Sequence, residues 1–315
     1  MQAEQIDRRV RPPWLEIGLW PADDGWKLRR FRAAPAPGVA PRGSLLFQAG
    51  RADFIEKYIE IYDHWRREGW SIEGFDWRGQ GGSGRMLDDG RLGHCPPYAR
   101  MVDDLACYHA EWRERSRGPH IMLGHSMGGH VVLRLLEERA PAIDGIVLLS
   151  PMLGLNTGLV RERLGRMIAR ALCRLGFTER PAWSEKSGRG SGHRQRNLTH
   201  SLERYADEQW WRQQDANFDL GPPTWGWLVH SWESIAGLLM PGALEKVSTP
   251  MLILCAEHDR LVLTAAAKLA AHRLPNAKLA CRADAAHEIL REVDPIRLWA
   301  LEEIDNFLGA LKSRT

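Results

Sequence analysis

Apolar and polar positions alternate along the chain with two periods, which predict strands and helices in turn. Short apolar runs are typical of buried strands. They occupy residues 43–47, 72–77, 120–123, 143–149, 251–255 and 277–281. Longer segments carry apolar residues at the spacing of one helix face. They occupy residues 54–67, 98–115, 127–139, 265–272 and 295–311. Residues 14–33 predict two strands around an Asp24-Gly25 turn.

The order of these elements predicts an α/β fold. Strands that alternate with helices form βαβ units, so we expect a mostly parallel central sheet with helices on both faces. The alternation stops between residues 151 and 243, a segment rich in arginine and tryptophan in which no strand is predicted. We therefore expect a first core part at 1–150, an inserted helical cap at 151–243, and a second core part at 244–315.

A G-x-S-x-G motif lies between a predicted strand and a predicted helix. It comprises residues 124–128, Gly-His-Ser-Met-Gly. In this context the chain turns so sharply that glycines are needed beside the serine, and the serine hydroxyl is raised above the sheet. We predict that Ser126 is a nucleophile. The Met127 N–H, at the start of the helix, is then a candidate oxyanion donor.

A serine nucleophile needs a base and an acid that orients the base. In this architecture the chain order is serine, acid, histidine, each after a strand. Asp259 follows the run at 251–255, and His287 follows the run at 277–281. These residues complete a predicted Ser126, Asp259 and His287 triad. The neighbouring Glu257 is a rival for the acid.

The loop after the first buried strand is expected to supply a second oxyanion donor. It reads Gln48-Ala49-Gly50-Arg51-Ala52. Gly50 allows the backbone to approach the serine, and the Arg51 N–H is the predicted donor. For the Arg51 side chain, exposure to solvent is favoured over contact with an anionic substrate group.

Composition and charge exclude several classes of protein. The formal net charge of +3 over 315 residues gives no basis for nucleic-acid binding. No stretch of about 20 apolar residues predicts a membrane span, and residues 1–14 lack the apolar core of a signal peptide. Five widely spaced cysteines fit reduced thiols in the cytoplasm. No nucleotide or zinc motif is present, so we expect no cofactor and no metal. The sequence specifies no oligomeric state.

The predicted cap has two unusual features, each with two interpretations. Six of the fourteen tryptophans lie in it and could line an acyl pocket or form the cap's own core. Residues 161–196 contain ten basic and three acidic residues, and part of this segment has helical apolar spacing. A basic amphipathic helix is typical of contact with an anionic membrane. A solvated basic face on a cap helix explains the same residues.

Several motifs together resemble α/β-hydrolases of the lysophospholipase L2 and monoacylglycerol lipase-like group. They are GHSMGG, FDWRGQGGSG, AEHDRLV and HEILREVD, supported by segments that begin at Arg51, Tyr98, Asn197 and Pro223. Ala49-Gly50, where monoacylglycerol lipases carry His-Gly, favours the lysophospholipase branch. The resemblance implies an α/β-hydrolase fold and a cytoplasmic serine hydrolase, peripheral on the inner membrane surface if the basic segment docks there.

The implied substrate is a single-chain lipid ester, lysophospholipid first. A monoacylglycerol lipase or broad carboxylesterase is the alternative, and an amide or peptide hydrolase is a weaker one because the same triad cleaves peptides. A non-enzymatic binding protein on this fold is a further rival, and the full set of Ser126, Asp259 and His287 argues against it.

Overall fold

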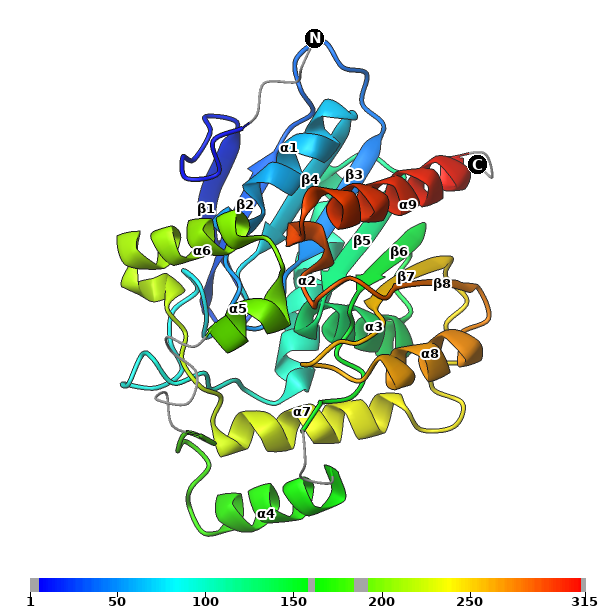
Figure 1. Ribbon diagram of the computed structural model, residues 1–315. Coiled ribbons are helices and arrows are strands. Elements are labelled where there is room, and N and C mark those ends of the chain that lie inside the picture. The colour runs from blue at the N-terminus through cyan, green and yellow to red at the C-terminus, as the bar shows by residue number, and fades with distance from the viewer. Residues whose placement is uncertain (1–5, 158–161, 184–191, 313–315) are drawn as a thin grey trace.

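An eight-stranded sheet forms the centre of the molecule in the computed structural model, which describes residues 6–157, 162–183 and 192–312 (Figure 1). The strands are β1 (Leu15–Pro21), β2 (Lys27–Ala33), β3 (Gly43–Gln48), β4 (Trp70–Phe75), β5 (His120–His125), β6 (Gly145–Leu149), β7 (Met251–Ala256) and β8 (Ala277–Arg282). Their order is β1-β2-β4-β3-β5-β6-β7-β8. β1, β2 and β4 pair antiparallel, and the pairs from β4 to β8 are parallel. The predicted α/β class is confirmed.

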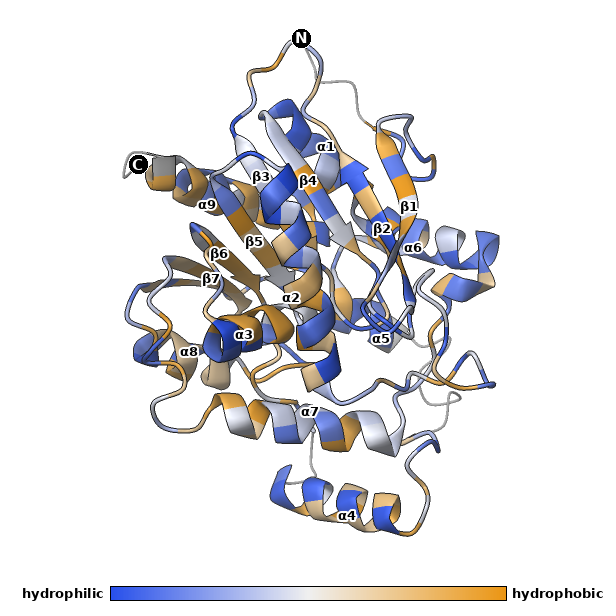
Figure 2. Cartoon of the chain, turned by 180° about the vertical axis from the view of Figure 1, so that it is seen from behind, coloured by the Kyte–Doolittle hydropathy of each residue, from blue (hydrophilic) through white to orange (hydrophobic). Residues whose placement is uncertain are grey.

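Helices cover both faces of this sheet. The helices of the core are α1 (Ile59–Arg67), α2 (Tyr98–Arg115), α3 (Met127–Arg139), α8 (Thr264–Arg273) and α9 (Asp294–Lys312), with 3-10 turns η1 (Ile55–Tyr58) and η4 (Ile289–Arg291). α1 and α9 lie on one face, and α2, α3 and α8 on the other, as the view from behind shows (Figure 2). Every residue of β3, β5, β6 and β7 is buried, which explains their continuous apolar runs.

Alternate residues of the central strands enter two different cores. Ile121 and Leu123 of β5 belong to the core with α1 and α9, whereas Met122 belongs to the core with α2, α3 and α8. This is the alternation that a strand buried on both faces requires. The carboxyl ends of the parallel strands therefore share one edge, where the predicted site residues gather.

In the described residues between β6 and β7, the regular elements are helices and 3-10 turns joined by loops, with isolated bridges and no named strand. These elements are α4 (Glu162–Arg174), α5 (Gly192–Leu198), α6 (Leu202–Gln214), η3 (Ala216–Phe218) and α7 (Trp225–Leu238). α7 crosses the lower end of the core and α4 packs mainly against α7 (Figure 1). Trp211, Trp227 and Trp232 are buried in the two cores, and Trp183 is 50% exposed. Packing, rather than an open acyl pocket, thus explains most of these large side chains.

Several element boundaries differ from the sequence prediction by a residue or two, and the largest difference is at the start of α1. The helix expected to start at residue 54 begins at Ile59, after the separate turn η1, and the strand expected at 72–77 is β4, Trp70–Phe75. Asp76 contacts the chain at both places. Its buried carboxylate accepts hydrogen bonds from the N–H groups of Ile55 and Gly82, at 3.0 and 2.8 Å, and so holds both chain turns. None of the described helices is both long and apolar enough to cross a membrane.

Candidate active site

The predicted nucleophile Ser126 lies in a strained turn between β5 and α3. Its φ of 51° and ψ of −116° are unfavourable for a residue with a side chain and cost about 1–3 kcal/mol. Three backbone hydrogen bonds hold this conformation. The Ser126 N–H donates to Leu149 at 2.9 Å, and its carbonyl accepts from His130 at 3.1 Å and Met152 at 3.0 Å. The turn is therefore fixed by β6 and by the chain that follows it.

The glycines of the motif are required by close backbone contacts. A Cβ on Gly128 would lie 2.3 Å from the Gln48 carbonyl oxygen and 2.4 Å from that of Ala49. A Cβ on Gly124 would lie 2.6 Å from the Gly129 Cα. The start of α3 thus rests directly on the loop after β3, and the predicted oxyanion loop and nucleophile turn share one interface.

Asp259 and His287 meet beside this turn. The His287 Nδ1 lies 2.7 Å from the Asp259 Oδ2, and both side chains are at least 96% buried, with 4% and 1% exposed. The other oxygen of Asp259 accepts the N–H groups of Leu261 and Val262 at 2.7 and 3.1 Å. The His287 ring lies 4.9 Å, centroid to centroid, from that of His125, the residue before Ser126. The three predicted triad residues are therefore gathered at the same sheet edge.

Burial and charge act in opposite directions on this pair. Burial lowers the pKa of His287, but the charge and hydrogen bond of Asp259 outweigh it, and the pKa is raised above its ordinary value. For Asp259, burial raises the pKa. His287 and the two backbone N–H groups lower it by more than burial raises it, so the net pKa falls below its ordinary value. A carboxylate so stabilised holds the imidazole with its Nδ1 protonated and its Nε2 available as a base.

The rival acid Glu257 lies elsewhere. Its carboxylate forms an ion pair with Lys268 at the surface, where its side chain is 33% exposed. That lysine lowers the pKa of Glu257 by a hydrogen bond. The geometry therefore favours Asp259 as the partner of His287.

In the predicted oxyanion loop, some backbone N–H groups donate hydrogen bonds within the protein and one does not. The Gly50 N–H donates to Asp53 at 2.8 Å, and the Ala52 N–H donates to the side chain of Gln80 at 3.2 Å. Between them, the Arg51 N–H meets no acceptor among the described residues. A Cβ built on Gly50 would lie 3.1 Å from the Ser126 Cβ, so this loop runs beside the nucleophile. The arrangement leaves the Arg51 N–H available for an oxyanion.

The Arg51 side chain is only partly exposed and is held by contacts with the protein, contrary to the interpretation favoured from the sequence. Its Nη2 donates to the Gly221 carbonyl at 2.6 Å, and its Cζ lies 5.3 Å from the centre of the Trp227 ring. Both partners belong to the segment between β6 and β7. The sequence interpretation failed because it considered the loop without the helices that cover it.

The glycine-rich stretch after β4 serves as a support for the oxyanion loop. The Gln80 amide accepts from Ala52 and donates to the Gly50 carbonyl at 2.8 Å, which clamps the loop on both sides of Arg51. The Trp77 indole donates to the Ala49 carbonyl at 2.7 Å. From the sequence, this stretch was noted only as one motif of the resemblance, and Gln80 was assigned no role. Its signal was the unusual run of glycines that lets the chain fold tightly beside the loop.

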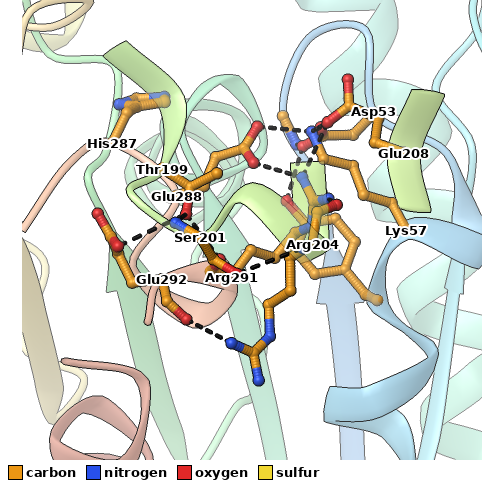
Figure 3. Close-up of polar contacts among 12 residues, drawn as sticks. Asp53, Lys57, Thr199, Ser201, Arg204, Glu208, His287, Glu288, Arg291 and Glu292 are labelled. Carbon is orange, nitrogen blue, oxygen red and sulfur yellow. Dashed lines mark hydrogen bonds and ion pairs between the residues drawn. The ribbon is translucent and has the colours of Figure 1, made fainter. Parts of the chain in front are cut away.

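A buried ion network connects the oxyanion loop, the histidine loop and α6. Lys57 Nζ lies 2.5 Å from Asp53, 2.6 Å from Glu288 and 3.1 Å from Glu208 of α6 (Figure 3). Arg291 contacts Glu208 at 2.8 Å and Glu288 at 2.5 Å. Each of these side chains is at most 4% exposed. Asp53 accepts the N–H of Gly50, the residue before the proposed oxyanion donor, and Glu288 is the residue after the predicted base. The network therefore holds these two loops in a fixed relative position.

The segment from residue 197 to residue 204 holds the histidine loop from above. The Glu288 N–H donates to the Leu198 carbonyl at 2.8 Å, and the Thr199 hydroxyl donates to the Arg291 carbonyl at 2.8 Å. Glu292 accepts from the N–H groups of Ala286 and His200 at 2.8 and 3.0 Å. Sequence analysis noted this segment only as part of a resemblance. Its role was invisible because the contacts join residues about 90 positions apart.

Metal ligands are not grouped at this site. Among the residues that the structure describes, no group of three or more histidine, cysteine, aspartate and glutamate side chains is placed to hold a metal ion. The groups gathered at this site are a buried acid and histidine pair, a serine in a strained turn, and an Arg51 N–H without an acceptor among the described residues.

The fold and this arrangement define an α/β-hydrolase. Residues 39–294 match the family model described as Serine aminopeptidase, S33, and the chain belongs to this family. It is 30% identical over 280 residues to lysophospholipase L2 of Escherichia coli (strain K12), covering 82% of this chain and 78% of that protein. It is 27% identical over 281 residues to probable lysophospholipase L2 of Haemophilus influenzae, covering 89% and 88%. The resemblance stated from the motifs is confirmed.

Solved structures show the same fold at low sequence identity. A soluble variant of the monoglyceride lipase of Saccharomyces cerevisiae, in complex with a substrate analogue, superposes with a TM-score of 0.75 at 17% identity, over 97% of this chain and 99% of that one. A thermostable carboxyl esterase of Bacillus coagulans gives 0.74 at 16% identity, over 94% and 98%. These similarities concern the fold alone.

Proposed function

We propose that this protein is a serine carboxylic-ester hydrolase that acts on single-chain lipid esters, with lysophospholipids as preferred substrates. The observation that carries the proposal is the contact of 2.7 Å between Asp259 and His287 beside the strained turn of Ser126. The two curated relatives, both described as lysophospholipase L2, support the substrate class. Monoacylglycerols are the second candidate, supported by the fold of the monoglyceride lipase.

The mechanism follows from the position of each group. Ser126 Oγ attacks the ester carbonyl while His287 accepts its proton, and Asp259 stabilises the resulting imidazolium. The N–H groups of Arg51 and Met127 stabilise the oxyanion. His287 then returns the proton to the leaving alcohol, and the acyl group remains on Ser126. Water, deprotonated by His287, attacks this acyl ester and releases the fatty acid.

Labelling and a substrate panel test this proposal together. The wild type is expected to react with a fluorophosphonate probe and to hydrolyse a lysophospholipid, and Ser126→Ala is expected to lose both while keeping its circular dichroism spectrum. The loss of turnover is expected to be about 10⁴-fold or more. Aminoacyl amides serve as the comparison. Retained labelling in Ser126→Ala, or faster cleavage of the amides than of any lipid ester, would contradict the proposal.

We further propose a peripheral contact with anionic membranes, at the cytoplasmic surface of the membrane. Its support is α4, which buries only Ala169. Apolar side chains remain exposed on this helix and just after it. They are Leu164 at 47%, Met167 at 63%, Ile168 at 42% and Leu175 at 72%. Arginines at 163, 166, 170 and 174 share the same helix. An exposed face that is both apolar and basic is suited to an anionic lipid surface.

Vesicle co-sedimentation tests this contact. Each arginine near an anionic surface contributes about 1 kcal/mol, screened by salt, so binding is expected to anionic vesicles at low salt and to weaken at about 0.5 M salt. Replacing the four α4 arginines with Gln is expected to abolish it. The control replaces four exposed arginines elsewhere with Gln, namely Arg113, Arg117, Arg139 and Arg260. Equal losses in the two variants, or equal binding to neutral vesicles, would contradict a contact through α4.

A further inference from the structure

The guanidinium of the partly buried Arg51 differs from those of the buried Arg29, Arg78 and Arg291 in having no acidic partner among the described residues. Arg29, Arg78 and Arg291 each contact two carboxylates, and these carboxylates contribute to the raised pKa of each arginine. Arg51 contacts only a carbonyl and the face of an indole, its Nε has no hydrogen-bond partner, and no described carboxylate lies within 4.0 Å of it. No carboxylate of the described residues therefore compensates its charge.

The surroundings of Arg51 make this charge costly. Burial lowers its pKa to about 10, and the positive charges of Arg194 and Arg212 act in the same direction. A buried cation is normally stabilised by a paired anion. An unpaired guanidinium is a candidate partner for an anionic ligand, since its planar group is suited to bind phosphate through two parallel hydrogen bonds.

The position of Arg51 relates this charge to the reacting ester. Its backbone N–H is the proposed oxyanion donor, so its Cα lies beside the carbonyl group of a bound substrate. From there the side chain extends to the line where the core meets the inserted segment. Gly93 N–H donates to the Pro222 carbonyl there at 2.9 Å, and Gly221 supplies the carbonyl that Arg51 contacts. The glycerol backbone of a lysophospholipid separates its ester from its phosphate by a chain of comparable length.

We propose that the Arg51 guanidinium binds the phosphate of the substrate and so selects lysophospholipids over neutral monoacylglycerols. This inference rests on the proposed function, because it assigns the head-group site of the same reaction. Arg51 then has two functions. Its backbone N–H stabilises the oxyanion of any ester, and its side chain distinguishes esters that carry a phosphate.

Gly93 has a place in the same site. A Cβ at this position would lie 1.9 Å from the Arg51 Nη2, so no side chain can occupy it while the guanidinium keeps its position. Gly93→Ala is therefore expected to displace the guanidinium without removing its charge. This variant gives a second way to disturb the proposed phosphate site.

A comparison of two substrates separates phosphate binding from a structural role. The substrates are a short-chain lysophosphatidylcholine and the monoacylglycerol with the same acyl chain, both below their critical micelle concentrations so that surface binding does not contribute. In Arg51→Met the ratio of kcat/KM for the two is expected to fall about 10- to 100-fold, the loss of one charge-assisted contact. Arg51→Lys is expected to be intermediate, and Gly93→Ala to lower the ratio. Exposed Arg180→Met is the control that leaves it unchanged.

The outcomes distinguish this inference from the proposed function. If Arg51→Met loses activity equally on both substrates, the side chain only supports the loop and the inference is wrong. If the wild type hydrolyses neither lipid, the proposed function itself is wrong.

A further measurement needs no variant. Glycerol 3-phosphate is expected to inhibit hydrolysis of p-nitrophenyl butyrate competitively, whereas glycerol is not. Equal inhibition by both compounds, or none by either at millimolar concentration, would also overturn the phosphate site.

Discussion

Removing the charge of Lys57 is expected to destabilise the protein strongly, because this lysine lies at the centre of the buried ion network. Its Nζ contacts Asp53, Glu288 and Glu208 at 2.5, 2.6 and 3.1 Å, and its side chain is 2% exposed. Lys57→Met retains most of the apolar stem and removes only the ammonium group. Arg291 continues to neutralise both glutamates. Asp53 then has no lysine or arginine within 4.0 Å among the described residues, and the Nδ1 of His125 lies 3.3 Å from its carboxylate.

The size of the effect follows from the buried charge that remains. Removing one partner of a buried ion pair costs about 3–5 kcal/mol, because the other charge is left without compensation. At about 2 °C per kcal/mol for a chain of this size, the midpoint of thermal unfolding falls by roughly 6–10 °C. Burial raises the pKa of Asp53, while in the wild type the charges and hydrogen bonds of Lys57 and His125 together more than offset this effect, and the net pKa is well below its ordinary value. The variant loses the contribution of Lys57, so the Asp53 pKa rises.

The sign of the pH dependence provides a second, independent check. In the wild type the lowered pKa of Asp53 contributes stability above the ordinary pKa of an aspartate, and this contribution is lost as the pH falls through the lowered value. In Lys57→Met the cost arises from ionised Asp53, so it is expected to be larger at about pH 8 than at about pH 5.

Urea unfolding, monitored by tryptophan fluorescence at both pH values, measures the effect of Lys57→Met. Lys246→Met is the control, because its ion pair with Glu137 lies at the surface and the Lys246 side chain is 55% exposed. The reasoning would be refuted if the two variants lost the same stability, or if the loss in Lys57→Met did not depend on pH.

Three further predictions concern the site. Asp259→Asn is expected to lower kcat by roughly 10⁴-fold, as in other triads, whereas Glu257→Gln, at a surface ion pair, should retain wild-type rates; the reverse order in ester hydrolysis would move the acid to Glu257. The wild-type kcat/KM should fall on the acid side of a midpoint that lies above the ordinary histidine pKa of about 6.5, because Asp259 raises the pKa of His287. The residual activity of Asp259→Asn should show a lower midpoint, and identical pH profiles of the two proteins would contradict this. Gly128→Ala should abolish turnover and destabilise the fold, since its Cβ would lie within 2.4 Å of two backbone oxygens of the oxyanion loop. A variant with unchanged rate and unfolding midpoint would show that the nucleophile turn and the oxyanion loop are not in this close contact.

The parts of the fold that were predictable are those determined by local pattern. The strand before Ser126 and the helix after it are visible because β5 is buried on both faces and α3 follows at once. The helices predicted at 98–115 and 127–139 have the same bounds in the structure. The start of α1 was mispredicted because Asp76, distant in sequence, takes the Ile55 N–H and leaves a separate turn before the helix. Such a tertiary bond leaves no periodic signal.

The candidate site divides in the same way. The placement of Ser126, Asp259 and His287 at one edge of the sheet could be predicted because each follows a strand, and parallel strands bring their carboxyl ends to one edge. Their catalytic roles stay a prediction. The residues that support these side chains could not be predicted, since Lys57 and Glu208 are joined only by folding. In the sequence, a buried lysine cannot be distinguished from any other charged residue in a helical segment. Its role depends on the carboxylates that the fold places around it.

The inserted segment makes two different kinds of contact with the core, and only one of them couples the segment's position to that of His287. Its middle part, from Leu198 through α6, is joined to the histidine loop by backbone hydrogen bonds and by the ion pairs of Glu208. Displacing it would move His287. α4, by contrast, packs mainly against α7 and buries a single residue. We therefore expect lipid-induced changes to be confined to the α4 and α7 side, where the guanidinium of Arg51 meets Gly221 and Trp227, while the α6 side keeps the predicted base in place.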